Sequence, residues 1–193
     1  ELFGYSDIPS GTELTDDLIR RSMHGYYACV SYADAQLGRL IDALKKAGVY
    51  ENTIIVLCGD NGYHHGNNGV WTKGVCWETT NHVPLLLKVP GAKKGQRSSA
   101  LVELLDIYPT LCDAAGLKTP EHCEGKSLLP LVEAPGRAWS EFAGSQFRKG
   151  NVIARSIRTD RYRFTLWEKG WGHIEGIELY DYINDPEGNV NLA

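Results

Sequence analysis

The sequence predicts an α/β fold, with part of a sheet sandwiched by helices and a small antiparallel β subdomain towards the C-terminal end. Apolar residues recur at helical spacing across residues 16–47, which predicts one long helix. Continuous β-branched and apolar runs at 53–58 and 84–89 are typical of strands buried on both faces, as in a parallel sheet. A long helix followed by buried strands is a piece of an α/β fold.

The expected helices have recognisable ends. Thr15 is a good N-cap for the long helix, and Gly48 is a natural stop. A second helix is expected over residues 106–115, with Asp106 as its cap. The residues before the first helix, 1–14, are expected to form a loop.

The pattern changes towards the C-terminal end. Three segments have the length and composition of short antiparallel strands. They are residues 152–158, 161–167 and 177–182. Between the first two, Thr159 and Asp160 are expected to form a tight turn. We therefore divide the chain into an α/β part, residues 1–140, and a small antiparallel β subdomain, residues 141–193.

Composition excludes several classes of function. The 193 residues are 42% hydrophobic and 23% charged, which is ordinary for a globular protein. A formal net charge of -4 argues against a nucleic-acid partner, which would favour a basic face. No apolar run approaches the roughly 18 residues of a membrane span. The chain opens with Glu1 rather than methionine, so we expect a fragment or a processed chain.

The five cysteines are scattered and include no CxxC pair, which argues against a zinc finger. Cys112 and Cys123 are close in sequence. The sequence allows two alternatives, a disulfide between these two residues or two free, buried thiols.

The polar and glycine-rich loop at 59–82 is the richest source of chemistry. It begins with Asp60 and Asn61, directly after the first apolar run. In open α/β sheets, ligands bind just beyond the carboxyl ends of strands. A carboxylate and a carboxamide are hard oxygen ligands, which suit calcium or magnesium better than zinc. The alternative is a plain turn, because Asp, Asn and Gly are common turn formers.

Further candidates stand later in the same loop. Lys73 can neutralise a bound oxyanion as a compact point charge, or it can be an ordinary surface lysine. His82 precedes the second apolar run and can reach back into the site or cap the strand. His64 and His65 are adjacent, so on an extended chain they point in different directions and are poor candidates for a shared metal.

Together, these residues resemble the second metal motif of the sulfatase family, within the alkaline phosphatase superfamily. That motif has Asp-Asn-Gly or Asp-His-Gly after a buried strand, then a Gly-x-x-Gly stretch and a lysine, as from Asp60 to Lys73 here. The order and spacing of further segments agree with the family over most of the chain. These segments are residues 81–85, 106–111, 156–159 and 178–181.

Among its subfamilies, the chain is most similar to the iduronate 2-sulfatase type, through residues 27–40 and 81–84. That type has His in place of Asn61 and an aromatic residue in place of Gly74. The resemblance implies a partial alkaline-phosphatase-like sheet and a parent enzyme that hydrolyses sulfate esters, of sugars or of other small molecules. It implies a periplasmic, secreted or lysosomal compartment.

The resemblance also implies roles for individual residues. Asp60 and Asn61 would be calcium ligands. Lys73 would be catalytic, holding a sulfate oxygen and stabilising charge in the transition state. His82 would contact the substrate.

The family's nucleophile is missing from this chain. Sulfatases use the Cys or Ser of Cys/Ser-x-Pro-x-Arg, matured to formylglycine, and no cysteine here has Pro two residues on and Arg four residues on. We expect it in an N-terminal half, which would be the chain's partner. Alone, the chain should be inactive and bind calcium weakly, because two side chains do not supply the 6–8 oxygens that calcium takes. Its uncovered apolar edges should favour self-association.

Two other functions are open. One is a phosphatase or phosphonate monoester hydrolase of the same superfamily. The other is a non-catalytic binding module that keeps the fold without the chemistry.

Overall fold

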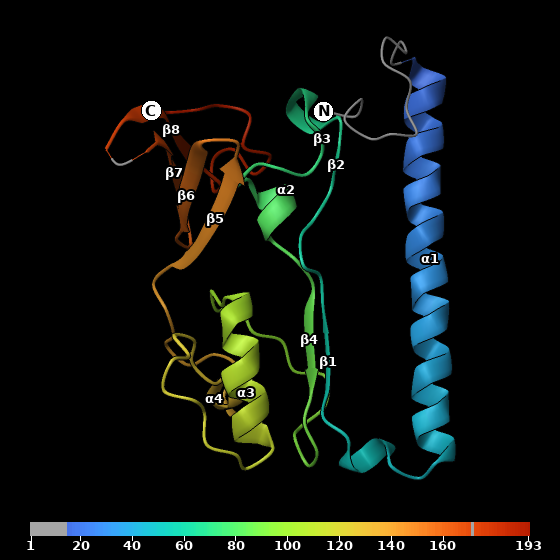
Figure 1. The fold of residues 1–193 in the computed structure, drawn as a ribbon. Helices are drawn as coiled ribbons and strands as arrows, with labels where there is room; N and C mark the ends of the chain where they lie inside the picture. The colour runs from blue at the N-terminus through green and yellow to red at the C-terminus, as the bar shows by residue number, and fades with distance from the viewer. Residues whose placement is uncertain (1–14, 171) are drawn as a thin grey trace. The chain divides into compact units, whose positions relative to one another are not determined.

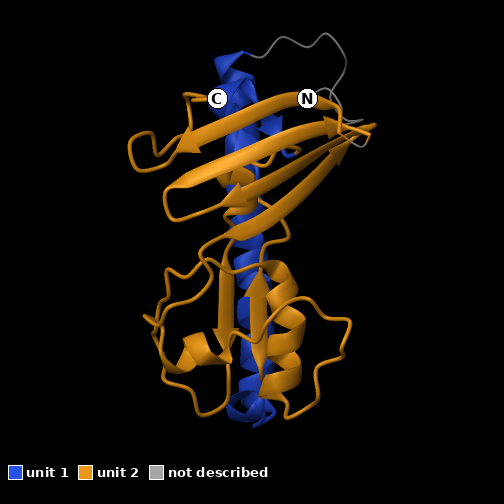
Figure 2. Cartoon of the chain, turned by 90° about the vertical axis from the view of Figure 1, so that its left-hand side faces the viewer, with its two compact units in different colours: residues 1–53, 63–73 blue, residues 54–62, 74–193 orange. Residues whose placement is uncertain are grey.

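The structure, a computed structural model, describes residues 15–170 and 172–193 (Figure 1). The loop expected at residues 1–14 lies outside the described residues. The chain divides into two compact units that alternate along the sequence (Figure 2). Unit 1 comprises Glu1–Thr53 and Tyr63–Lys73, and unit 2 comprises Ile54–Gly62 and Gly74–Ala193.

Unit 1 is dominated by one long helix. Its elements are α1 (Asp16–Lys46), η2 (Tyr50–Asn52), β2 (His64–His65), η3 (Asn67–Gly69) and β3 (Trp71–Thr72). The side chain of Thr15 accepts a hydrogen bond from the Leu18 N–H at 3.3 Å, as expected of an N-cap. Gly48 follows the helix with a φ of 71°, which is a common way to end one. The predicted helix at 16–47 is therefore confirmed.

The first part of unit 2 contains two strands, three short α-helices and one 3-10 helix. Its elements are β1 (Ile55–Cys58), α2 (Glu78–Asn81), β4 (Leu85–Lys88), η4 (Leu104–Asp106), α3 (Ile107–Ala114) and α4 (Leu129–Glu133). Both apolar runs form strands at the predicted places, but they pair with each other in antiparallel register. The prediction of burial on both faces is wrong for these strands, since Leu57 is 41% exposed and Leu86 58% exposed. Two short strands by themselves cannot cover both faces of their own ladder.

The second predicted helix is present as α3, but its cap differs from the prediction. The Asp106 carboxylate accepts from the Glu103 N–H at 3.0 Å and from the Lys126 N–H at 2.9 Å. It thereby caps η4 and holds the loop at Lys126, and makes no side-chain cap bond to α3. Asp106 is buried, so both bonds satisfy a carboxylate that water does not reach well.

The C-terminal part of unit 2 is a four-stranded antiparallel meander. Its strands are β5 (Ala143–Lys149), β6 (Val152–Arg158), β7 (Tyr162–Lys169) and β8 (Ile174–Asp181), in that spatial order (Figure 1). This confirms the predicted antiparallel sheet and adds β5. The sequence of β5 contains no β-branched residue, which explains why its pattern gave no strand signal.

The tight turn predicted at Thr159 and Asp160 is also confirmed. The Thr159 N–H donates to the Tyr162 carbonyl at 2.8 Å, and the Tyr162 N–H donates back to the Thr159 Oγ1 at 3.0 Å. One face of the sheet is buried through Ala154, Ser156 and Thr165.

All five cysteines are free thiols in the structure, Cys112 and Cys123 among them. In the part of the chain that the structure describes, no helix combines the length and the apolar character needed to cross a membrane.

Candidate functional site

The Asp60-Asn61-Gly62 turn lies directly beyond the end of β1. The Gly59 N–H donates to the Pro84 carbonyl at 3.0 Å, which ties the exit of β1 to the start of β4. The Asp60 side chain is exposed, and its Oδ1 accepts from the Asn61 N–H at 3.0 Å. Its other carboxylate oxygen makes no hydrogen bond to the residues that the structure describes. The Asp60 carboxylate is thus fixed at one oxygen while it faces solvent, as a residue that binds an external ligand needs to be.

Gly62 seats this turn on the backbone of α2. Its N–H donates to the Thr80 carbonyl at 2.7 Å. A Cβ atom at this position would lie 1.9 Å from the Thr79 carbonyl oxygen, so any residue but glycine would push the turn away from the helix. The glycine of the Asp-Asn-Gly motif is therefore required by close backbone approach and not only by the turn.

His82 is the C-cap residue of the same short helix. Its N–H donates to the Glu78 carbonyl at 2.8 Å, and its side chain is 79% exposed. The imidazole Nδ1 lies 3.6 Å from the Glu78 Oε1. The structure thus brings three of the predicted site residues, Asp60, Asn61 and His82, to segments that are both bonded to α2.

Sequence analysis missed the residues that hold α2 itself. The Glu78 Oε2 accepts from the Arg158 Nε at 3.0 Å and from the Arg163 Nη2 at 2.8 Å. Burial alone would raise the pKa of Glu78, but the hydrogen bonds and charges of Arg163 and Arg158 lower it below its ordinary value. The carboxylate is therefore held ionised between two arginines from the C-terminal sheet.

Three further hydrogen bonds fasten α2 to the sheet. The Trp77 indole N–H donates to the Glu178 carboxylate at 2.9 Å, and the Glu78 N–H donates to the Tyr182 hydroxyl at 3.2 Å. The Asn81 amide donates to the Ser145 hydroxyl at 2.6 Å. The family-like segments 81–85, 156–159 and 178–181 contain some of these residues, but the sequence gave them no role in holding α2.

Lys73 is the last residue of unit 1. Its side chain is exposed, and its carbonyl accepts from the Thr72 hydroxyl at 3.3 Å. Thr72 is buried and has a φ of 74°, which is unusual for a β-branched residue. A left-handed conformation there costs about 1–3 kcal/mol, and such strain tends to collect at functional positions.

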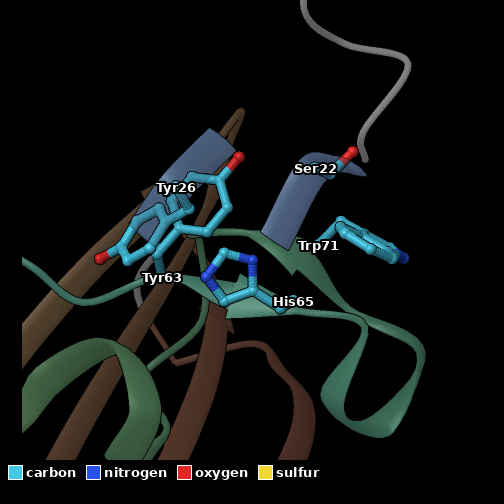
Figure 3. Close-up of a pocket in the computed structure, with 5 residues that line it drawn as sticks. All are labelled: Ser22, Tyr26, Tyr63, His65 and Trp71. Atoms are coloured by element: carbon cyan, nitrogen blue, oxygen red, sulfur yellow. The ribbon is translucent and has the colours of Figure 1, made fainter. Parts of the chain in front are cut away.

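The two histidines of unit 1 have different surroundings. His64 is fully buried and lies opposite Thr72 in the β2–β3 ladder. His65 lines a small cavity of about 210 Å³ with Ser22, Tyr26, Tyr63 and Trp71. Figure 3 shows the rings of Tyr26, Tyr63 and His65 gathered together, with Trp71 apart from them. Burial lowers the pKa of His65, which favours the neutral imidazole.

The fit of the predicted calcium ligands can be judged from their donor atoms. Across residues 15–170 and 172–193, no group of three or more His, Cys, Asp or Glu side chains is placed to hold a metal ion. Asp60 and Asn61 carry side-chain oxygens of the kind that calcium prefers, and their turn is anchored to α2 with Asp60 exposed and Asn61 half-buried. The donor chemistry fits calcium, while the number of donors falls short of a complete shell.

The comparisons with known proteins identify the family. The family model described as Sulfatase matches residues 5–117, which is more than half of the chain. The chain belongs to the sulfatase family. A second model, described as the C-terminal part of N-sulphoglucosamine sulphohydrolase, matches residues 66–193 of this sulfatase chain.

A curated relative and two solved structures are similar to this sulfatase chain. A sulfatase of Formosa agariphila is 36% identical over 174 residues, covering 90% of the chain and 33% of that protein. A structure of BT4656 in complex with its substrate, D-glucosamine-2-N,6-O-disulfate, superposes with a TM-score of 0.81 at 30% identity, covering 90% of this chain and 36% of that one. The phosphonate monoester hydrolase of Agrobacterium radiobacter superposes with a TM-score of 0.82 at 26% identity, covering 98% of this chain and 40% of that one.

These likenesses confirm the predicted fold class, an alkaline-phosphatase-like α/β fold with a C-terminal antiparallel sheet. They also show that the chain spans about a third of the length of the curated relatives it matches.

Proposed function

We propose that this chain is the C-terminal portion of a sulfatase that hydrolyses sulfate esters of sugars. The observation that carries the proposal is the Asp60-Asn61-Gly62 turn, which exposes Asp60 at the end of β1 and is held to α2 by the Gly62–Thr80 hydrogen bond of 2.7 Å. A Cβ atom at Gly62 would lie 1.9 Å from the Thr79 carbonyl oxygen, so this position requires glycine. A turn that served only to connect two strands would not need such a close approach to a neighbouring backbone.

Asp60 and Asn61 would hold calcium in this proposal. When bound, the ion would supply positive charge beside the sulfate group. Lys73 would hold a sulfate oxygen as a compact cation, and His82, whose side chain is 79% exposed, would donate to the substrate. The nucleophile would come from outside these 193 residues, in the N-terminal half as formylglycine, so the chain alone would be inactive.

A sulfated sugar is the substrate class that the relatives favour. BT4656, 30% identical to this chain, has D-glucosamine-2-N,6-O-disulfate as its substrate. The finer prediction of an iduronate 2-sulfatase type rests on residues 27–40 and 81–84. Gly74 departs from that type for a reason visible in the fold: its φ is 124°, and a Cβ there would lie 3.2 Å from the Phe147 ring. Phe147 of β5 thus brings an aromatic side chain to Gly74, which lies in the loop after β3.

Calcium binding by the chain tests the metal part of the proposal. Calorimetric titration of calcium into the purified chain should give weak binding, which Asp60→Ala abolishes. Asp160→Ala removes a carboxylate from the exposed turn after β6 and is the matched control. Equal calcium binding by the wild type and Asp60→Ala would contradict the assignment.

A phosphonate monoester hydrolase is the second candidate, because the Agrobacterium radiobacter enzyme of that class superposes over 98% of this chain. The product of the whole gene, assayed with a sulfate ester and a phosphonate monoester of the same alcohol, separates the two. A higher kcat/KM for the sulfate ester supports the sulfatase, and the reverse order supports the second candidate.

A further inference from the structure

We infer that Glu78 is a positioning residue, through which the C-terminal sheet holds the metal-binding turn and His82 in place. The inference deepens the proposed function and rests on it for the roles of Asp60, Asn61 and His82. Glu78 itself lies in α2 and is not among the residues expected to touch substrate or calcium.

The two oxygens of the Glu78 carboxylate have separate tasks. Oε2 accepts from both arginines of the sheet, at 3.0 Å from the Arg158 Nε and 2.8 Å from the Arg163 Nη2. The second oxygen, Oε1, lies 3.6 Å from the His82 Nδ1. A carboxylate that is fixed at one oxygen orients whatever the other oxygen faces, so the exposed imidazole has a fixed partner on one side.

The arginines are themselves held. The Arg163 side chain is only 4% exposed, and its Nη1 donates to the Ser156 hydroxyl at 3.3 Å. The Arg158 side chain is 15% exposed, and its guanidinium lies 4.9 Å from the centre of the Tyr182 ring. These buried cations are costly to leave unpaired, so they bind Glu78 firmly.

The same helix carries the metal-binding turn. Glu78 lies two residues before Thr80, whose carbonyl accepts the Gly62 N–H. Because α2 has only four residues, it has little rigidity of its own, and its position depends on its side-chain bonds to the sheet. Loosening the Glu78 pair should therefore move or free both Gly62 and His82.

A purely structural role predicts a different outcome. If Glu78 only adds stability to the sheet, its loss should weaken the whole of unit 2 evenly. If it positions α2, its loss should act on Gly62 far more than on the sheet interior. Amide hydrogen exchange distinguishes these outcomes, because it reports local opening residue by residue.

The test compares Glu78→Gln with Arg161→Gln in the 193-residue chain. Arg161 pairs with Asp181 inside the sheet, at 2.7 Å, and serves as the matched control. We expect Glu78→Gln to speed exchange of the Gly62 amide by about tenfold relative to the Thr165 amide in β7. Arg161→Gln should leave that ratio unchanged. A Gly62/Thr165 ratio that is the same in Glu78→Gln and in wild type would overturn the inference.

A milder variant covers failure of Glu78→Gln to fold. Arg158→Lys leaves the Arg163 bond to Glu78 intact and weakens one of the two contacts. The same Gly62/Thr165 exchange ratio is measured for this variant, and we expect a smaller rise than in Glu78→Gln. An unchanged ratio would count against the inference.

Activity of the whole-gene product gives a second readout. Glu78→Gln should lower kcat/KM for a sulfate ester by roughly 100-fold, as expected when a site residue is displaced by about 1 Å. Arg161→Gln should keep it within about twofold. If the wild type hydrolyses no sulfate ester, the proposed function fails while the exchange ratio still decides the positioning role. If the wild type is active and Glu78→Gln equals it, the positioning role fails alone.

Discussion

The two sheets of unit 2 differ in how far they cover themselves. The β1–β4 ladder has four residues per strand, and it leaves two of its leucines exposed, Leu57 at 41% and Leu86 at 58%. The β5–β8 sheet has strands of seven or eight residues and buries a continuous row on one face, with Ala154 and Thr165 at 0% exposed. The first sheet is rich in apolar residues yet poorly buried, whereas the second is more polar and better buried.

This difference indicates that the C-terminal sheet stabilises the rest of unit 2. The C-terminal sheet holds buried polar groups that satisfy one another, such as Ser156 with Thr165 at 2.9 Å. It also reaches out through Arg158 and Arg163 to α2. The Asp60-Asn61-Gly62 turn, at the end of the weakly covered ladder, is thus supported from the well-covered sheet.

The largest expected effect follows removal of the most buried arginine. Arg163→Ala removes one of the two arginines that bind Glu78 and one of the two hydrogen-bond partners of Ser156, and should lower the free energy of unfolding by about 3 kcal/mol or more. Urea denaturation followed by tryptophan fluorescence measures it. A loss below about 1 kcal/mol would show that the sheet does not depend on this pair.

Hydrogen exchange tests the comparison without a mutation. Amides of β1 and β4 should exchange roughly 100-fold faster than those of β6 and β7, because their ladder has less buried contact around it. The measurement is deuterium uptake by the folded chain, resolved by residue. Equal protection in the two sheets would mean that exposure of Leu57 and Leu86 does not weaken the first one.

The free energy of unfolding should depend on pH through the ion pairs between Glu78 and the C-terminal sheet. The lowered pKa of Glu78 means that its ion pairs contribute fully above its ordinary pKa, near 4.5, and are lost as the pH falls below that value. The free energy of unfolding of the wild type should therefore fall on acidification below about pH 5. In Glu78→Gln this fall should be shallower, and denaturation curves at pH 7, 5 and 4 compare the two. An identical slope in both proteins would argue against an ionised Glu78.

The smallest expected effect concerns the exposed ladder. Leu86→Thr should change stability by less than about 0.5 kcal/mol, because its side chain is already in solvent. It should also reduce self-association, which sedimentation velocity measures. Leu87→Thr, at a half-buried neighbouring position, is the control and should cost more stability. Unchanged association in Leu86→Thr would show that this face is not the contact.

Much of the fold was predictable because its signals are local. Helical spacing and the Thr15 cap predicted α1, and apolar runs predicted β1 and β4. The antiparallel pairing and exposure of these strands were not predictable, because they depend on which other segments cover them. Asp106 illustrates the same limit: its type suits a helix cap, but its partners, Glu103 and Lys126, include one 20 residues away.

The candidate site was predictable in part. Residue types and family likeness indicated Asp60, Asn61, Lys73 and His82. The supporting role of Glu78 was not predictable, because its arginine partners lie 80 and 85 residues further along the chain. Only a fold brings such residues together.

The most direct test of the proposed sulfatase function is hydrolysis of a sulfated glucosamine by the whole-gene product and its Lys73→Ala variant. Lys93→Ala, an exposed lysine outside the loop, is the control. The account predicts turnover by the wild type and the control, a loss of roughly 100-fold or more in Lys73→Ala, and none by the 193-residue chain alone. Turnover by the isolated chain, or equal rates with and without Lys73, would contradict it.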